Sequence, residues 1–149
     1  MSPDPIVGLQ PTDLEQLTAL LGANGLPTAD CAEQLPIFCG VFDQGELIAA
    51  GGLEPAGEYA LLRSVVVQDR HRGAGLAKTI TQQLLQQARD ESRAAVYLLT
   101  ETADAYFKRQ GFERVARDSV PVEIARTRQF VSLCPDSAIC MRIELSQPG

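Results

Sequence analysis

A strand, a glycine-rich turn and a helix follow one another directly in residues 59–89, and this succession constrains the fold more than any other feature. YALLRSVVV (59–67) is apolar on both faces at its far end, which predicts a central strand. An amphipathic helix is predicted from Gly75 to Arg89, because its apolar residues recur at helical spacing: Leu76, Ile80, Leu84, Leu85 and Ala88. AVYLLT (95–100) reads as the next buried strand.

The flanking segments supply further elements of the same sheet. A helix is expected from about Thr12, with a capping box of Thr12 and Glu15 and an end at Gly22. The other expected helices cover about 28–34, 101–110 and 121–130, and the other strands cover 6–9, two runs within 37–55 around a turn at 43–46, 112–119 and 138–145. We therefore predict one α/β (α+β) domain over residues 1–149, with a single mixed, largely antiparallel twisted sheet of about six to seven strands and helices on both faces.

The charge and composition of the chain argue against several classes of binding partner. A formal net charge of −6 argues against general nucleic-acid binding, which requires a basic surface. The N-terminus lacks the pattern of a signal peptide, and no apolar run approaches the roughly 20 residues that span a bilayer, so we expect a cytoplasmic protein without membrane contact. The four cysteines have no CxxC spacing and His71 is the only histidine, so no metal site is expected.

The segment DRHRGAGLAK (69–78) is basic, although the chain as a whole is acidic. A glycine-rich turn that leads from a strand into a helix exposes unpaired N–H groups at a helix N-terminus, which suits a phosphate or pyrophosphate. Gly73 and Gly75 allow close approach of the backbone, and Arg70 and Arg72 add positive charge. A Walker A loop and a dinucleotide-binding fingerprint both fail on spacing, and an ordinary turn with a solvated basic surface remains the alternative.

The motif R-x-x-G-x-G (Arg70 to Gly75) after an apolar strand, with a short later helix that ends in Gly111-Phe112, resembles the GCN5-related N-acetyltransferase (GNAT) superfamily. The resemblance covers about residues 5–145. It implies that acetyl-CoA is the co-substrate, that the AVYLLT strand diverges from its neighbour, and that a backbone N–H near Val66 stabilises the oxyanion. The implied cofactor-binding residues are Val65, Val66, Val67, Arg70, His71, Arg72, Gly73, Ala74, Gly75, Leu76, Ala77 and Phe107.

The catalytic groups depart from the usual pattern of the superfamily. The position of its usual general-acid tyrosine is Phe107 here, and Tyr106 points about 100° away on the helix. Some amino-acid acetyltransferases read E-I-R-S on the central strand where this chain reads Leu-Leu-Arg63-Ser64, so the strand carboxylate is lost. We predict Glu54 as the base, acting through a water, and Arg63 with Ser64 as substrate-binding residues. Arg63 either pairs internally or binds a substrate carboxylate.

The tail pattern RxxxFxxLCPxSAxCM closely resembles small acetyltransferases of bacterial arsenic-resistance operons. This resemblance implies a small-molecule amine as acceptor, either an amino acid or an arsenic-containing analogue, with Arg128 and Ser132 at the substrate. Cys134 and Cys140 either bind arsenic or only pack the final strand. The alternatives are an N-acetylglutamate synthase-like enzyme and a non-catalytic acyl-CoA-binding sensor, and the superfamily resemblance also allows a homodimer.

Overall fold

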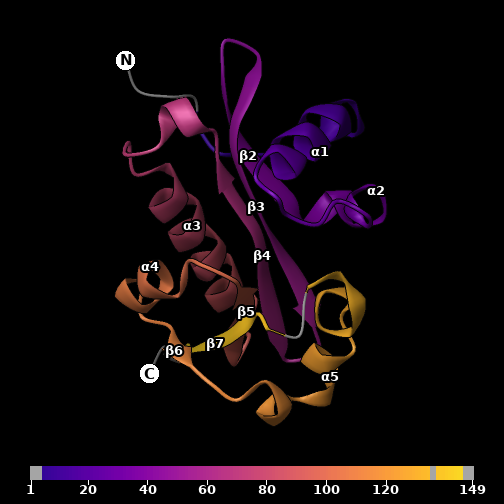
Figure 1. Ribbon diagram of the computed structural model, residues 1–149, viewed down its shortest axis with the longest axis vertical. Coiled ribbons are helices and arrows are strands. Elements are labelled where there is room, and N and C mark those ends of the chain that lie inside the picture. Colours follow the sequence, from indigo (N-terminus) through magenta and orange to yellow (C-terminus); the bar gives the residue numbers. More distant parts are fainter. Residues whose placement is uncertain (1–4, 135–136, 146–149) are drawn as a thin grey trace. The chain divides into compact units, whose positions relative to one another are not determined.

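The computed structural model describes residues 5–134 and 137–145, and seven strands within these ranges form one mixed sheet (Figure 1). Along the sheet the strand order is β1-β2-β3-β4-β5-β7-β6. This architecture confirms the predicted fold class. The strands are β1 Val7–Gly8, β2 Phe38–Asp43, β3 Glu46–Ala56, β4 Tyr59–Val67, β5 Ala95–Thr100, β6 Glu113–Arg114 and β7 Ile139–Glu144.

The main helices are α1 Leu14–Ala23, α2 Cys31–Gln34, α3 Leu76–Asp90, α4 Asp104–Arg109 and α5 Val122–Ala125. Several sequence-based boundaries are wrong. The segment predicted as a strand over 112–119 pairs only at β6, and the helix predicted over 121–130 divides into α5 and a π-helical turn at Gln129–Leu133. Both segments are short and carry proline or mixed polarity, so tertiary contacts rather than local periodicity decide their conformation.

The start of α1 also differs from the prediction. Thr12 lies within a 3₁₀ turn, Pro11–Asp13, and the backbone N–H of Gln10 donates to the Asp13 carboxylate at 2.7 Å. The proposed box of Thr12 and Glu15 is therefore wrong, because the capping contact lies two residues earlier. Gly22 is likewise inside α1 and does not end it.

The pairing of β5 explains why the sheet is mixed. β5 pairs with β4 in parallel over three residues, from Tyr59↔Ala95 to Leu61↔Tyr97, as a strand–helix–strand crossover through α3 requires. β5 pairs with β7 antiparallel over its full length, Ala95 to Thr100. The pairing with β4 thus covers the first three residues of β5, while the pairing with β7 continues to Thr100.

The chain divides into two compact units, and the first comprises the described residues within Met1–Leu53 together with Ser64–Leu84. Ala50 of β3 packs in a core with Leu17 and Leu21 of α1 and Cys31 of α2. A Cβ placed on the adjacent Gly51 would come within 2.8 Å of Ile80 Cγ2 on α3. Since successive strand residues point to opposite faces, α1 and α2 cover one face of this unit and α3 covers the other (Figure 1).

The second unit comprises Glu54–Arg63 and the described residues from Leu85 onward. Its core joins four strands to α5, through the buried side chains of Ala56, Leu61, Ala95, Tyr97, Ile124 and Cys140. Tyr97 also packs edge-on against Tyr59, with the ring centroids 5.9 Å apart. This core lies along the last residues of β3 and the first half of β4, which carry Glu54 and Arg63.

Candidate active site

The turn from β4 into α3 presents a backbone built for an anion. Gly73 and Gly75 have φ angles of +91° and +78°, and a Cβ added to either would meet no protein atom within 4 Å. The N–H of Thr79 bonds the carbonyl of Gly75 at 3.0 Å, which is the first helical hydrogen bond of α3. The N–H groups of Leu76, Ala77 and Lys78, which open α3, therefore have no acceptor within the helix, and the dipole of this 15-residue helix favours negative charge beside them.

The basic side chains of the turn have partners within their own unit. Arg70 donates through Nη2 to Glu46 and through Nε to Gln68 Oε1 at 3.0 Å. Arg72 pairs with Asp69 at 3.0 Å and also donates to the Asn24 side chain. His71 Nδ1 lies 2.8 Å from the same Gln68 oxygen. The arginines thus bond to the β2–β3 hairpin and the end of α1 while remaining exposed, and the backbone from Gly73 to Gly75 is exposed beside them.

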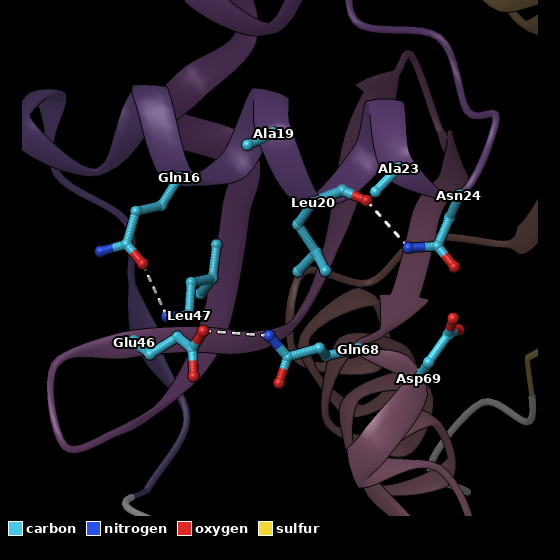
Figure 2. A pocket seen from close by; sticks show the side chains of 9 residues that line it. All are labelled: Gln16, Ala19, Leu20, Ala23, Asn24, Glu46, Leu47, Gln68 and Asp69. Atoms are coloured by element: carbon cyan, nitrogen blue, oxygen red, sulfur yellow. Dashed lines mark hydrogen bonds between the residues drawn. The ribbon is translucent and has the colours of Figure 1, made fainter.

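A pocket of about 300 Å³ lies beside this turn, between α1 and the start of β3 (Figure 2). Leu20 and Leu47 contribute apolar surface to it, and its polar groups are largely engaged with one another. Gln16 accepts from the N–H of Leu47 at 2.9 Å, and Gln68 Nε2 donates to Glu46 Oε2 at 3.1 Å. The hydrogen bond from Gln68, together with the hydrogen bond and positive charge of Arg70, holds the pKa of Glu46 below its usual value. The pocket walls therefore anchor the turn to the hairpin and α1.

Ser64 marks an irregular point in β4. Its φ is +59°, a left-handed conformation that is rare for a residue other than glycine and costs about 1–2 kcal/mol. Strained backbone of this kind concentrates at functional sites. Its position in the motif predicts a substrate-binding residue, and no pattern in the sequence reveals its conformation. The residues that follow it, Val66 and Val67, are buried.

Glu54 of β3 and Arg63 of β4 form a buried ion pair in the second unit. Arg63 Nη1 donates to Glu54 Oε1 at 3.2 Å, and the two side chains are 1% and 12% exposed, respectively. Of the two roles that the sequence left open for Arg63, the internal pairing is the one observed. The sequence predicts separate roles for Glu54 and Arg63, and a spacing of nine residues does not indicate that the two side chains form an ion pair. Their catalytic and substrate-binding roles stay predictions.

Phe107 lies in an aromatic cluster of the second unit. It is buried, and its ring is 5.7 Å from that of Phe112 and 5.2 Å from that of Tyr106, both edge-on. Arg109 stacks over Tyr106, 5.9 Å from the ring centroid. Phe107 has no hydroxyl, so this position offers packing but no proton donor. Its predicted contact with the cofactor stays a prediction.

The tail residues differ in accessibility. Arg128 and Ser132 are exposed, as substrate-binding residues at a surface would be, but this exposure does not test their role. Cys140 is buried, and burial raises the pKa of its thiol to about 11. Cys134 is half-buried and donates to Gln129 Oε1 at 2.8 Å. Neither cysteine forms a disulfide, and within residues 5–134 and 137–145 no three His, Cys, Asp or Glu side chains converge as a metal site would require.

Comparison with known proteins identifies the class. The acetyltransferase (GNAT) family profile matches residues 11–112, about two thirds of the chain, and the chain belongs to this family. It is therefore an N-acetyltransferase that uses acetyl-CoA, and the superfamily prediction is confirmed. No curated protein sequence matches the chain. No helix in the described part of the chain is long and apolar enough to cross a membrane.

Solved structures share the fold at low sequence identity. N-acetylglutamate synthase from Neisseria gonorrhoeae, complexed with coenzyme A and N-acetyl-glutamate, superposes with a TM-score of 0.83 and 14% identity over 96% of this chain, which spans only 35% of that one. Rv2747 from Mycobacterium tuberculosis, in complex with CoA and NLQ, superposes with a TM-score of 0.81 and 20% identity. The match covers 96% of this chain and 100% of that one. PaiA N-acetyltransferase from Thermoplasma acidophilum, in complex with coenzyme A, superposes with a TM-score of 0.72 and 14% identity. The match covers 97% of this chain and 100% of that one.

Proposed function

We propose that the acceptor is the amine of a small amino acid or of an arsenic-containing amino-acid analogue. The observation that carries this proposal is the buried pair of Glu54 and Arg63, because it holds a carboxylate in a fixed position beside a guanidinium, the two groups that complement the ammonium and the carboxylate of an amino acid. The tail pattern supports the arsenic-containing analogue. A similar fold that binds N-acetyl-glutamate supports an amino acid.

In the proposed reaction, Glu54 accepts a proton from the substrate ammonium group through a water molecule. The neutral amine nitrogen then attacks the thioester carbonyl carbon of acetyl-CoA. The N–H of Val66 stabilises the oxyanion, the nitrogen releases its second proton to water, and the C–S bond breaks to give the amide and the coenzyme A thiolate. The turn from Arg70 to Ala77 binds the pyrophosphate, mainly through the backbone N–H groups that precede Thr79.

The departing thiolate takes its proton from water in this scheme. A thiol has a pKa near 8.5, so the thiolate is a tolerable leaving group without a dedicated acid. Phe107 packs against Phe112 where many relatives carry the tyrosine that protonates this sulfur. Arg128 and Ser132 contact the substrate in this proposal, together with Ser64, while Arg63 fixes Glu54 and is proposed to attract the substrate carboxylate by its charge.

Release of coenzyme A thiol from acetyl-CoA, measured across a panel of amines, tests the proposal directly. The panel contains the common amino acids, L-glutamate among them, together with amino acids that bear an arsenic-containing side chain and simple amines without a carboxylate. We expect turnover with amino acids or their arsenic analogues and at least tenfold lower kcat/KM with the simple amines, a discrimination worth about 1.4 kcal/mol. Preference for L-glutamate would favour the synthase-like alternative.

The Glu54→Gln variant tests the base. We expect kcat to fall by about 100-fold or more, the usual contribution of a positioned base, while the Kd for coenzyme A stays unchanged. Glu58→Gln is the matched control, since Glu58 is an exposed carboxylate in the hairpin turn after β3. Tight coenzyme A binding without thiol release for any amine would contradict the proposal and favour an acyl-CoA-binding sensor.

A further inference from the structure

Glu46, Gln68 and Arg70 form a closed ring of hydrogen bonds at the base of the phosphate-binding turn. Gln68 Nε2 donates to Glu46 Oε2 at 3.1 Å, as Figure 2 shows. Gln68 Oε1 accepts from Arg70 Nε at 3.0 Å, and Arg70 Nη2 donates to Glu46 Oε1. The N–H of Gln68 is itself fixed to the carbonyl of Ile48 at 2.8 Å. The ring therefore holds the Arg70 guanidinium on the hairpin.

Of the two hydrogen bonds that Arg70 makes in this ring, one is local and the other can be exchanged for a ligand. The bond from Nε to Gln68 joins residues two apart on the same segment, whereas the bond from Nη2 reaches across 24 residues to Glu46. The Arg70 and Glu46 side chains are 67% and 45% exposed. An ion pair exposed to this extent is weak, and a phosphate is a strong acceptor for a guanidinium, so a polyanion on the turn can displace the carboxylate.

We infer that Glu46 competes with the pyrophosphate of coenzyme A for Arg70. In the free protein Glu46 holds Nη2 of Arg70, and when the cofactor binds, Nη2 passes to a phosphate oxygen while Nε stays on Gln68. Glu46 thereby lowers the affinity for acetyl-CoA and promotes release of the coenzyme A product. The inference rests on coenzyme A as the ligand of the turn and does not depend on the acceptor amine.

Binding of coenzyme A to the full chain, measured by isothermal titration calorimetry, tests this exchange. We expect Glu46→Gln to lower the Kd by about two- to fivefold, the range that corresponds to the energy of one exposed ion pair. Glu46→Asp keeps the charge, so its Kd should remain closer to that of the wild type. Glu15→Gln removes an exposed carboxylate from α1 of the same unit and should leave the Kd unchanged.

A double-mutant cycle separates exchange from general repulsion between Glu46 and the ligand. In an Arg70→Gln background, Glu46→Gln should no longer improve the Kd, because the arginine for which Glu46 competes is gone. The inference is overturned if Glu46→Gln leaves the Kd unchanged or raises it, or if the improvement persists undiminished without Arg70. Inorganic pyrophosphate, used as a competitor of coenzyme A, should gain potency in Glu46→Gln by the same factor. Failure to acetylate any amine would leave these binding results intact.

Discussion

Removing one partner of the Glu54–Arg63 pair should destabilise the fold far more than removing both. At 3.2 Å and an effective dielectric constant near 20, the Coulomb attraction of two unit charges is about 5 kcal/mol, which is opposed by the cost of burying both charges. Glu54→Leu leaves a guanidinium on a side chain that is only 1% exposed, so we expect a loss of about 3–5 kcal/mol in the free energy of unfolding. Arg63→Met leaves a carboxylate that water reaches more easily, so its loss should lie toward the lower end of that range.

The double variant Glu54→Leu/Arg63→Met removes both charges and should lie within about 1 kcal/mol of the wild type, or above it. The coupling energy from the cycle is then about 3 kcal/mol or more. Urea unfolding followed by far-ultraviolet circular dichroism measures it, because the chain contains no tryptophan for fluorescence. If the two single losses simply add in the double variant, the ion pair is not the source of the stability and the reasoning is refuted.

Three further predictions, at the glycines of β3 and α1, at Ser64 and at Cys39, test other parts of the structure. Gly51→Ala should lower the free energy of unfolding by about 1–3 kcal/mol, since its Cβ would lie 2.8 Å from Ile80 Cγ2. Gly22→Ala is the contrast, because a Cβ there would meet no atom within 4 Å and the residue lies within α1. In the same urea titration it should raise the free energy of unfolding by up to about 1 kcal/mol. Ser64→Gly should raise stability by about 1 kcal/mol and Ser64→Val should lower it, because φ is +59° there; an equal effect of the two on the urea midpoint would exclude backbone strain. Burial raises the pKa of Cys39 from 9.0 to about 11, so its contribution to stability is complete below about pH 9 and is lost as the pH rises toward 11. The decline in the urea midpoint between pH 8 and 11 should therefore be shallower in Cys39→Ala, and identical slopes would contradict the role of this thiol.

Local patterns predicted the elements whose identity depends on their own residues. The stripe of Leu76, Ile80, Leu84, Leu85 and Ala88 predicted α3, and all five are buried. The segments over 112–119 and 121–130 were predicted less well. There, short runs of mixed polarity take their conformation from the strands and helices against which they pack.

The sequence by itself determined the strand–turn–helix unit, because apolar periodicity and the two glycines act over a few neighbouring residues. It thereby determined the fold class, the family and the nature of the co-substrate. Only the tertiary structure decided the partners of the charged residues. Glu54 meets Arg63 across nine residues and Glu46 meets Arg70 across 24, because paired strands bring distant positions within hydrogen-bond reach. Charge pairing has no sequence period, so these contacts, and the chemistry proposed for them, became visible only in the folded chain.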